Sequence, residues 1–421
     1  MKPRILDDRR LTALAREHGT PLFVYDADIV RRRIGELAGF DVVRYAQKAN
    51  SSRALLKLVR SAGGQVDAVS AGEIVRALAA GFEASEIAFT SDLFDRAALD
   101  VLARHPVPVN LGSPDMLDQY ARLLDAAWAV RGERGREVTL RLNPGFGHGH
   151  DRKVTTGGET SKHGIWHADL AALARHAHEL GLRIAGLHVH IGSGSDFEHL
   201  TRVCAAMQGF ARTVGANLTT ISAGGGLPVP YRDGEERIDI ARFTETWIAT
   251  KQAIERELGR KLTLEVEPGR YLVAEAGALL CEVRSAKRNG RFDYVLVDAG
   301  FHNLVRPAMY GAYHQISAVG RDASEASSPK VVGGPLCESA DVFTIDGEGE
   351  LAPIPLPALR EGDLVCIHDA GAYATSMASN YNSQPFPAEV LVDGGVARLV
   401  RRRQTIEALL EDERARPDPR Q

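Results

Sequence analysis

Lys48 is a lysine whose position indicates chemistry. It lies in the stretch VRYAQKAN (residues 43–50), where an apolar run leads into a lysine followed by a small residue. A free lysine amine is mostly protonated at neutral pH, but one that is held at a strand end and partly desolvated becomes a nucleophile for an aldehyde. Considered alone, Lys48 is more simply a strand-end lysine with its ammonium group in water.

A second candidate is the glycine-rich stretch SAGGGLPVPY (222–231). Its consecutive glycines, 224–226, leave backbone N–H groups uncovered, and this suits a phosphate dianion when a helix begins nearby. A flexible turn has the same composition, so the glycines alone are weak evidence for a phosphate site.

A buried carboxylate is expected in EVEPGRYLV (265–273), where Glu267 ends an apolar run. A glutamate at such a position needs a partner. An ion pair with Arg270, three residues later, would provide one. The alternative is a carboxylate that keeps the pyridine nitrogen of a cofactor protonated.

Two histidines, His188 and His190, are spaced i, i+2 in GLHVHIGSG (186–194) and therefore share one face of a strand. An HxH pair also suits the metal site of a barrel hydrolase, which would need further ligands at other strand ends. His148 and His150 of GHGH lie in a glycine-rich stretch instead. We therefore favour a flat cofactor stacked on the ring of His190, and we expect no metal.

The elements that would position these residues form a regular series between residues 40 and 270. Eight apolar runs alternate with amphipathic helical patterns: DVVRYAQ, QVDAVS, IAFTS, VPVNLGS, EVTLRLNP, RIAGLHVHI, TTISAGGG and LTLEVEP. This count predicts a (β/α)8 barrel, with a doubly wound open sheet as the competing topology. In a barrel, the carboxyl ends of all the strands meet on one face, which would bring Lys48, His190 and Glu267 together.

The pattern changes after residue 270 to strand-like runs separated by turns, such as DYVLVDAG and DLVCIHDAGAY. This predicts a C-terminal all-β domain (271–421), either a β-barrel or a sandwich, beside the barrel (31–270). The N-terminal segment (1–30) contains PLFVYD and is expected to add a strand to the β-domain. The interval 143–166 is rich in glycine and polar residues, which is typical of a functional loop.

Composition excludes several functional classes for this chain of 421 residues. Lysine and arginine (51) nearly balance aspartate and glutamate (55), so neither a nucleic-acid footprint nor a polybasic membrane anchor is expected. The basic run at 398–404 is more simply a solvated junction. No apolar stretch approaches the ~20 residues that a membrane span needs, the start of the chain lacks an apolar signal-peptide core, and the four cysteines are scattered. We therefore expect a cytoplasmic protein without disulfides.

Taken together, seven motifs resemble one family, the fold-type III, alanine-racemase-like decarboxylases that depend on pyridoxal 5'-phosphate. The motifs are YAQKAN, HVHIGSG, AGGGLPVPY, EPGRYLVA, RPAMYGAYH, CESADVF and GAYATSMASNYNSQPFPAEVLV. The similarity is strongest to the proteobacterial diaminopimelate decarboxylases, and it covers nearly the whole chain in order. It implies decarboxylation of meso-2,6-diaminopimelate to L-lysine and CO2, the last step of lysine biosynthesis. It also implies a homodimer with shared active sites.

The resemblance also implies residue roles. Lys48 would bind the cofactor covalently, His190 would stack on its ring, Glu267 would hold its pyridine nitrogen, and Cys337 would donate a proton. Residues matching the cofactor segments are Ser193, Gly225, Gly226, Pro268, Gly269, Arg270 and Tyr373. Residues matching the substrate contacts are Arg270, Arg306, Tyr310, Glu338 and Tyr373. Cys337 and Glu338 would reach the site of the partner subunit.

Two positions depart from the family pattern: Ala340 replaces a usual glycine and Gln384 replaces a frequent arginine. Neither matches a catalytic residue, so we interpret both as local packing changes. Related decarboxylases of ornithine, arginine or carboxynorspermidine remain alternatives, as do a racemase and a non-catalytic binding homologue. A distal guanidinium at Arg306 favours diaminopimelate, because it would repel the bare ammonium of ornithine.

Overall fold

The computed structural model describes residues 5–147, 157–190, 196–321 and 325–413. The chain divides into two compact units. We call Val30–Val229 with Glu236–Leu272 the barrel unit, and Met1–Ile29 with Pro230–Glu235 and Val273–Gln421 the β unit. The domains proposed from the sequence, 31–270 and 271–421, remain a proposal. Residues 230–235 lie within the first of these ranges, but their contacts place them in the β unit.

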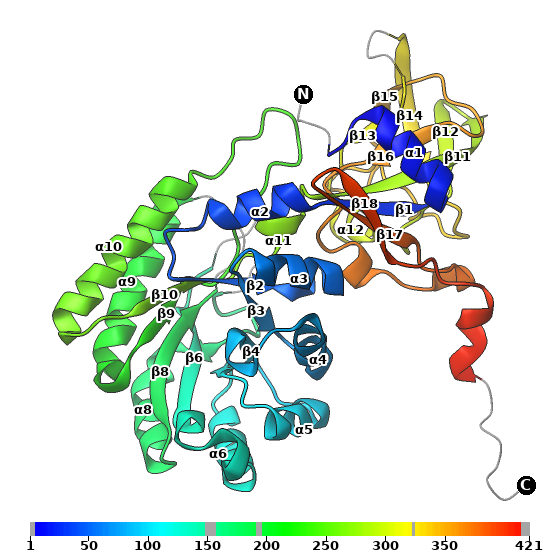
Figure 1. Ribbon diagram of the computed structural model, residues 1–421. Coiled ribbons are helices and arrows are strands. Elements are labelled where there is room, and N and C mark those ends of the chain that lie inside the picture. Colours follow the sequence, from blue (N-terminus) through cyan, green and yellow to red (C-terminus); the bar gives the residue numbers. More distant parts are fainter. Residues whose placement is uncertain (1–4, 148–156, 191–195, 322–324, 414–421) are drawn as a thin grey trace, which may run out of the picture. The chain divides into compact units, whose positions relative to one another are not determined.

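The barrel unit is built on eight strands that are parallel throughout and close on themselves (Figure 1). The strands are β2 (Val42–Ala46), β3 (Gln65–Ala68), β4 (Ile87–Ser91), β5 (Val109–Leu111), β6 (Glu137–Asn143), β8 (Arg183–Val189), β9 (Thr220–Ser222) and β10 (Thr263–Val266). Pairing of β10 with β2 and of β5 with β6 completes the ring, and the short β7 (Ile165–Trp166) adds to β6. The predicted barrel is confirmed and the open sheet is excluded.

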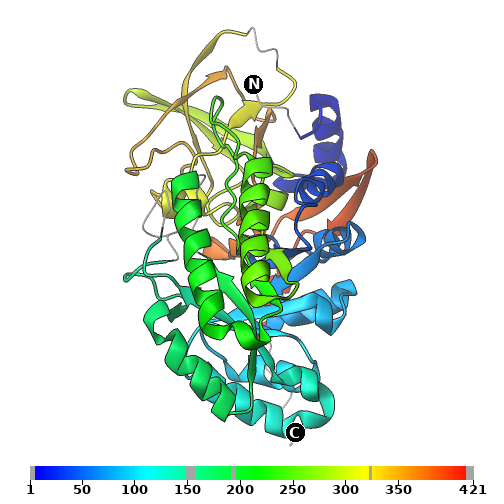
Figure 2. The same cartoon turned by 90° about the vertical axis from the view of Figure 1, so that its left-hand side faces the viewer.

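Helices connect the strands and lie outside them (Figure 1, Figure 2). They are α2 (Ala27–Gly35), α3 (Arg53–Ser61), α4 (Ala71–Ala80), α5 (Arg96–Arg104), α6 (Met116–Ala126), α7 (Trp128–Arg131), α8 (Leu170–Glu179), α9 (Phe197–Val214), α10 (Ile240–Leu258) and α11 (Arg270–Val273). In α3, the buried Leu55, Leu56 and Val59 form the apolar face that packs inward. Sequence signals set the bounds of α10: the Asp239 side chain accepts from Arg242 N, and Gly259 adopts a left-handed φ of 65°.

The β unit contains a mixed sheet. Its strands are β1 (Leu22–Asp26), β11 (Gly277–Asn289), β12 (Phe292–Val297), β13 (Ile316–Ala318), β14 (Ser327–Gly333), β15 (Ile354–Pro357), β16 (Leu364–Ile367), β17 (Ala388–Asp393) and β18 (Val396–Arg401). The order is β15-β14-β12-β11-β1-β17-β18, and β16 pairs with both β11 and β13. The N-terminal strand β1 lies between β11 and β17.

Among its described residues, this unit also contains the helices α1 (Asp8–His18) and α12 (Arg306–Tyr310). Leu11 and Leu14 of α1 join Leu22 and Val24 of β1 and Val390 of β17 in one apolar cluster. Across both units, the described residues also form short 3-10 turns: η1 (Gln47–Ala49), η2 (Ala84–Glu86), η3 (Glu133–Arg136), η5 (His167–Asp169), η6 (Gly215–Asn217), η7 (Thr375–Met377), η8 (Tyr381–Ser383) and η9 (Glu407–Glu413). Within the described ranges, no helix is long and apolar enough to cross a membrane.

Candidate active site

Lys48 lies in η1, directly after β2, at the carboxyl end of the barrel strands. Its neighbours Gln47 and Ala49 are buried, whereas Lys48 itself is exposed. The Gln47 amide donates to Glu73 O at 3.0 Å, which fixes the turn on the first residues of α4. The sequence therefore folds a rigid turn that leaves the amine of Lys48 accessible.

Pro268 and Gly269 lie against the turn that carries Lys48. Ala46 N donates to Pro268 O at 3.1 Å. A Cβ on Gly269 would lie 3.2 Å from Ala46 O and 3.3 Å from the Ala49 Cβ, so this close approach favours glycine. Arg270, half-buried, begins α11 directly afterwards.

Glu267 follows β10, and its carboxylate is held by two side chains. Its Oε2 lies 2.7 Å from His188 Nε2, and its Oε1 accepts from Ser222 Oγ at 3.1 Å. Burial would raise the pKa of Glu267, but the charge and hydrogen bond of His188, with help from Arg44, lower it to about 2. Glu267 is therefore an ionised carboxylate at every physiological pH, although only 7% of it is exposed.

His190 lies two residues beyond His188, and the two rings are parallel within 4°, with centroids 6.5 Å apart. Gly225 N donates to His190 Nδ1 at 2.8 Å. Burial, together with the nearby cations Lys48 and Arg141, lowers the pKa of His190 well below its usual value. The ring is therefore neutral, and since Nδ1 accepts, its proton is on Nε2.

The glycines at 224–226 are required by their surroundings. Gly224 has a φ of 63°, and a Cβ there would lie 2.0 Å from Val189 O. A Cβ on Gly225 would lie 2.5 Å from Glu267 O and 3.0 Å from His190 Cε1. Gly226 also has a positive φ, 94°. The loop thus approaches His190 and Glu267 more closely than any other residue type allows.

Asp67 on β3 was not among the predicted site residues. Its burial and the charge of Glu267 raise its pKa to about 7, although Lys48 opposes this. Lys48, Asp67 and Glu267 therefore interact electrostatically at one end of the barrel. The only sequence signal was a single acidic residue inside the apolar run QVDAVS.

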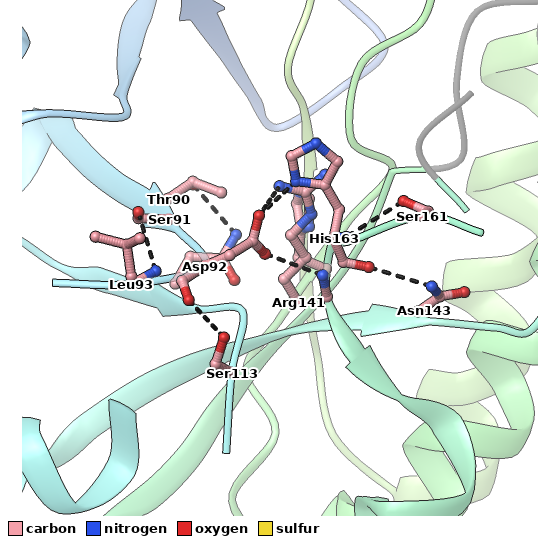
Figure 3. A network of polar contacts seen from close by, with 12 residues as sticks. Thr90, Ser91, Asp92, Leu93, Ser113, Arg141, Asn143, Ser161 and His163 are labelled. Atoms are coloured by element: carbon pink, nitrogen blue, oxygen red, sulfur yellow. Dashed lines mark hydrogen bonds and ion pairs between the residues drawn. The ribbon is translucent and has the colours of Figure 1, made fainter. Parts of the chain in front are cut away.

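A second polar group surrounds Asp92, which follows β4 (Figure 3). Its carboxylate contacts His163 Nδ1, accepts from Gly164 N at 2.9 Å and lies 3.9 Å from Arg141 Nη1. Burial would raise the pKa of Asp92, but the hydrogen bond from His163 and the charge of Arg141 lower it. Asp92 therefore joins β4, β6 and the end of the 143–166 interval.

Asn143, the last residue of β6, binds both described parts of that interval. Its Nδ2 donates to Gly158 O at 3.0 Å and to His163 O at 3.2 Å. Its Oδ1 accepts from Gly158 N at 2.9 Å and from Gly145 N at 3.1 Å. The predicted candidates His148, His150 and Ser193 lie outside the described residues.

One nitrogen of each histidine in the HxH pair is engaged by another group of the protein. His188 Nε2 is bonded to Glu267 and His190 Nδ1 accepts an N–H. In the part of the chain that the structure describes, no group of three or more histidine, cysteine, aspartate or glutamate side chains is placed to hold a metal ion.

The β unit contains the remaining candidates, grouped on three segments. Arg306 begins α12 and is buried, with 7% exposed, whereas Tyr310 at its end and Tyr373 are half-buried. Arg306 Nη1 lies 2.9 Å from His314 Nε2, and its guanidinium lies 4.7 Å from the ring centre of Tyr231.

Cys337 and Glu338 are both exposed on the segment that follows β14. Asp341 fixes this segment, because its carboxylate accepts from Phe301 N at 2.7 Å and from Leu336 N at 2.8 Å. The Cys337 backbone donates to Asn382 Oδ1 at 2.8 Å. The hydrogen bonds therefore join the segments around 301, 337 and 382.

The departures at Ala340 and Gln384 lie in these segments. Ala340 is exposed and its carbonyl accepts from Val342 N at 2.8 Å. Gln384 O accepts from the Asn380 side chain at 2.8 Å. Both contacts use the backbone carbonyls of these residues, so neither depends on the identity of the side chain.

The barrel unit thus gathers one set of predicted site residues and the β unit another. The first set is Lys48, His190, Gly225, Gly226, Glu267, Pro268, Gly269 and Arg270. The second set is Arg306, Tyr310, Cys337, Glu338 and Tyr373. The barrel set offers a reactive amine, a neutral ring, a fixed anion and a close backbone loop. The β-unit set offers a guanidinium, a carboxylate, a thiol and two phenols.

Comparison with protein families gives one matching model. It is described as the pyridoxal binding domain of pyridoxal-dependent decarboxylases, and it matches residues 28–274. This range contains every predicted cofactor residue of the barrel unit.

Relatives named diaminopimelate decarboxylase match nearly the full chain. That of Streptomyces coelicolor is 50% identical, over 98% of this chain and 93% of its own length. That of Escherichia coli K12 is also 50% identical, over 96% of both.

Solved structures agree with these relatives. A crystal structure of diaminopimelate decarboxylase with 49% identity has a TM-score of 0.92 and covers 98% of both chains. The Helicobacter pylori enzyme, complexed with L-lysine, has 29% identity and a TM-score of 0.84, and covers 96% of this chain and 98% of its own.

Proposed function

The chain belongs to the diaminopimelate decarboxylases, a family of pyridoxal-dependent decarboxylases, and on that premise we propose how its residues perform the reaction. The activity is decarboxylation of meso-2,6-diaminopimelate to L-lysine and CO2. The observation that carries the proposal is the buried, ionised Glu267, which lies beside the neutral ring of His190 and the glycine loop.

Pyridoxal 5'-phosphate fits the residues present. A Cβ on Gly225 would fill the space beside His190 and Glu267, so the loop is shaped for a close approach there. A carboxylate whose pKa is about 2 can hold a protonated pyridine nitrogen at neutral pH. When bound, this cofactor supplies an electron sink for the electron pair that the departing carboxyl group leaves behind.

The predicted cofactor residues would hold and orient the cofactor. Lys48 binds the cofactor covalently through its amine, Glu267 holds the proton on the pyridine nitrogen, and the neutral ring of His190 stacks on the pyridine face. The N–H of Gly225 orients the ring of His190, because it donates to His190 Nδ1. We assign binding of the cofactor phosphate to Gly226, Gly269, Arg270, Tyr373 and Ser193. Pro268 shapes the turn between Glu267 and Gly269.

The β-unit residues recognise the substrate and complete the reaction. Arg306 pairs with the distal carboxylate, which ornithine lacks, and Glu338 pairs with the distal ammonium. Tyr310, Tyr373 and Arg270 complete the substrate contacts. Contacts to the distal end would determine how the substrate is placed in the site. Cys337 would donate a proton to the α-carbon at the position that the departing carboxyl group has left.

We propose that Cys337 and Glu338 act in the site of a second copy of this chain, in a homodimer. Their exposure in the single chain supports this assignment, because a residue that completes a partner's site must be accessible. The cytoplasmic location stays a prediction.

Borohydride reduction followed by peptide mapping tests the covalent role of Lys48. Reduction fixes the cofactor to the amine that holds it, so the label is expected on the peptide containing Lys48. Lys48→Met should remove the label and the activity, whereas Lys57→Met, at an exposed lysine on α3, should remove neither. CO2 release from diaminopimelate, ornithine, arginine and carboxynorspermidine then defines the substrate. A label elsewhere, or a preference for a substrate without a distal carboxylate, would contradict the proposal.

A further inference from the structure

Arg306 is held by a chain of hydrogen bonds inside the β unit. Its Nη1 lies 2.9 Å from His314 Nε2, and His314 Nδ1 lies 2.8 Å from the backbone carbonyl oxygen of His368. Arg306 is 7% exposed and His314 is 3% exposed. The contact is therefore shielded from water on both sides.

The partners determine the proton positions on His314. A guanidinium only donates, so His314 Nε2 must accept and carries no proton. A carbonyl oxygen only accepts, so Nδ1 must carry the proton. His314 is thus a neutral imidazole in one tautomer, and the backbone of His368 selects that tautomer.

Tyr231 restrains the same guanidinium on its face. Its ring centre lies 4.7 Å from the Arg306 Cζ, and the ring meets His314 edge-on at 5.4 Å. A guanidinium is planar, so fixing one edge and one face sets the direction of all its N–H groups. A flexible arginine would lose this direction and with it the fit to a carboxylate.

We propose that His314 is a positioning residue that directs Arg306 toward the distal carboxylate of the substrate and so contributes to selectivity. The inference rests on the function proposed above, and it adds a specificity role to a residue that touches Arg306 and not the reacting atoms.

The test compares substitutions that remove or keep the acceptor. His314→Phe keeps a ring against Tyr231 but has no acceptor, whereas His314→Gln places an amide oxygen at about the reach of Nε2. In His314→Phe the KM for diaminopimelate should rise about tenfold or more, with kcat and cofactor uptake nearly unchanged. In His314→Gln the KM should stay close to that of the wild type.

A pair of inhibitors separates positioning from general damage. L-lysine and cadaverine differ by one carboxylate, so only L-lysine can use Arg306 in this way. In His314→Phe, inhibition by L-lysine should weaken about tenfold or more while inhibition by cadaverine stays the same. His368→Gln is the matched control, because its side chain contacts Ser317 at 2.8 Å and its backbone carbonyl is retained.

Equal weakening of both inhibitors, or an unchanged KM in His314→Phe, would overturn the inference while leaving the proposed function intact. If His314→Phe does not fold, His314→Asn provides the contrast with His314→Gln, because its shorter amide cannot reach the position of Nε2. Equal KM values in those two variants would also overturn the inference. A wild-type enzyme that releases no CO2 from diaminopimelate would overturn the proposed function and this inference with it.

Discussion

His188 Nε2 lies 2.7 Å from Glu267 Oε2, and both side chains are buried where β8 and β10 end. His188 belongs to β8, and Glu267 follows β10, 79 residues later in the chain. The strand β9 lies between β8 and β10 in the barrel. This contact is the main favourable reason that a carboxylate with so little exposure stays ionised. The pair therefore connects two strands of the barrel and keeps charged the carboxylate that we propose as the partner of the cofactor nitrogen.

Replacing His188 should raise the pKa of Glu267. In His188→Leu, burial acts with less opposition, so we expect kcat to fall about tenfold or more and the acid limb of its pH profile to move to higher pH. His188→Gln keeps an N–H donor, so its kcat and the acid limb of its pH profile should lie between those of the wild type and His188→Leu. The measurement is kcat against pH from about 5 to 9. Identical pH profiles in all three proteins would show that His188 does not control the charge of Glu267.

The same pKa has a consequence for stability. The pKa of Glu267 is depressed from 4.5 to about 2, so its contribution to folding is fully present above pH 4.5 and is lost as the pH falls toward 2. In His188→Leu this loss should begin at a higher pH. Acid unfolding followed by circular dichroism measures the shift.

The sequence predicted the barrel because each of its eight strands is an apolar run bounded by turn residues, and their carboxyl ends must share one face. The same reasoning placed the predicted site residues Lys48, His190 and Glu267 at strand ends. Asp92 was not predicted as a site residue, because its contact depends on His163, which lies in an irregular segment without periodicity. The strands β13 and β15 were not predicted. The sequence of β15 is IPLP, and prolines inside a run argue against a strand.

Arg306→Ala should abolish efficient turnover of diaminopimelate while cofactor binding remains. Loss of a buried charged partner costs about 2–5 kcal/mol, or roughly 30- to 5,000-fold in kcat/KM. Arg306→Lys keeps the charge but not the planar fork, so it should recover only part of the loss. Absorbance near 420 nm, about where a bound pyridoxal cofactor absorbs, monitors cofactor retention. Activity of Arg306→Ala at the wild-type level would show that Arg306 does not bind the substrate.

Arg44 and Glu265 form a bidentate pair inside the barrel unit, with N···O distances of 2.7 and 2.8 Å. Arg44→Met leaves the Glu265 carboxylate without its partner, and should destabilise the protein by about 3–5 kcal/mol. Adding Glu265→Leu should recover much of that loss, since neither member of the pair then leaves an unpaired charge behind. Breaking the exposed pair Arg212–Glu257 by Arg212→Met should cost less than about 1 kcal/mol. Urea unfolding of the wild type, Arg44→Met, Glu265→Leu, the double variant and Arg212→Met tests the non-additivity of the Arg44 and Glu265 changes, and purely additive costs would contradict it.

Asn143 provides a graded test of how the 143–166 interval is held. Asn143→Ala removes all four hydrogen bonds to Gly145, Gly158 and His163. Asn143→Asp keeps the acceptor for Gly145 N and Gly158 N but loses both donors. Amide hydrogen exchange at Gly145 and Gly158 should therefore accelerate in the alanine variant and change less in the aspartate variant. Equal acceleration in the two variants would assign the protection to another contact.

Mixing two inactive variants tests whether the sites are shared between subunits. Lys48→Met removes the covalent anchor and Cys337→Ala removes the proposed proton donor, so each homodimer should be inactive. If Lys48 of one subunit works with Cys337 of the other, a hybrid dimer contains one intact site and one site that carries both changes. Random reassociation of equal amounts makes half of the dimers hybrid, and activity should return to about a quarter of the wild-type level. If both residues of a site came from one chain, every site in the mixture would carry a defect. No activity would then return after subunit exchange, although size-exclusion chromatography of differently tagged variants would still show hybrid dimers.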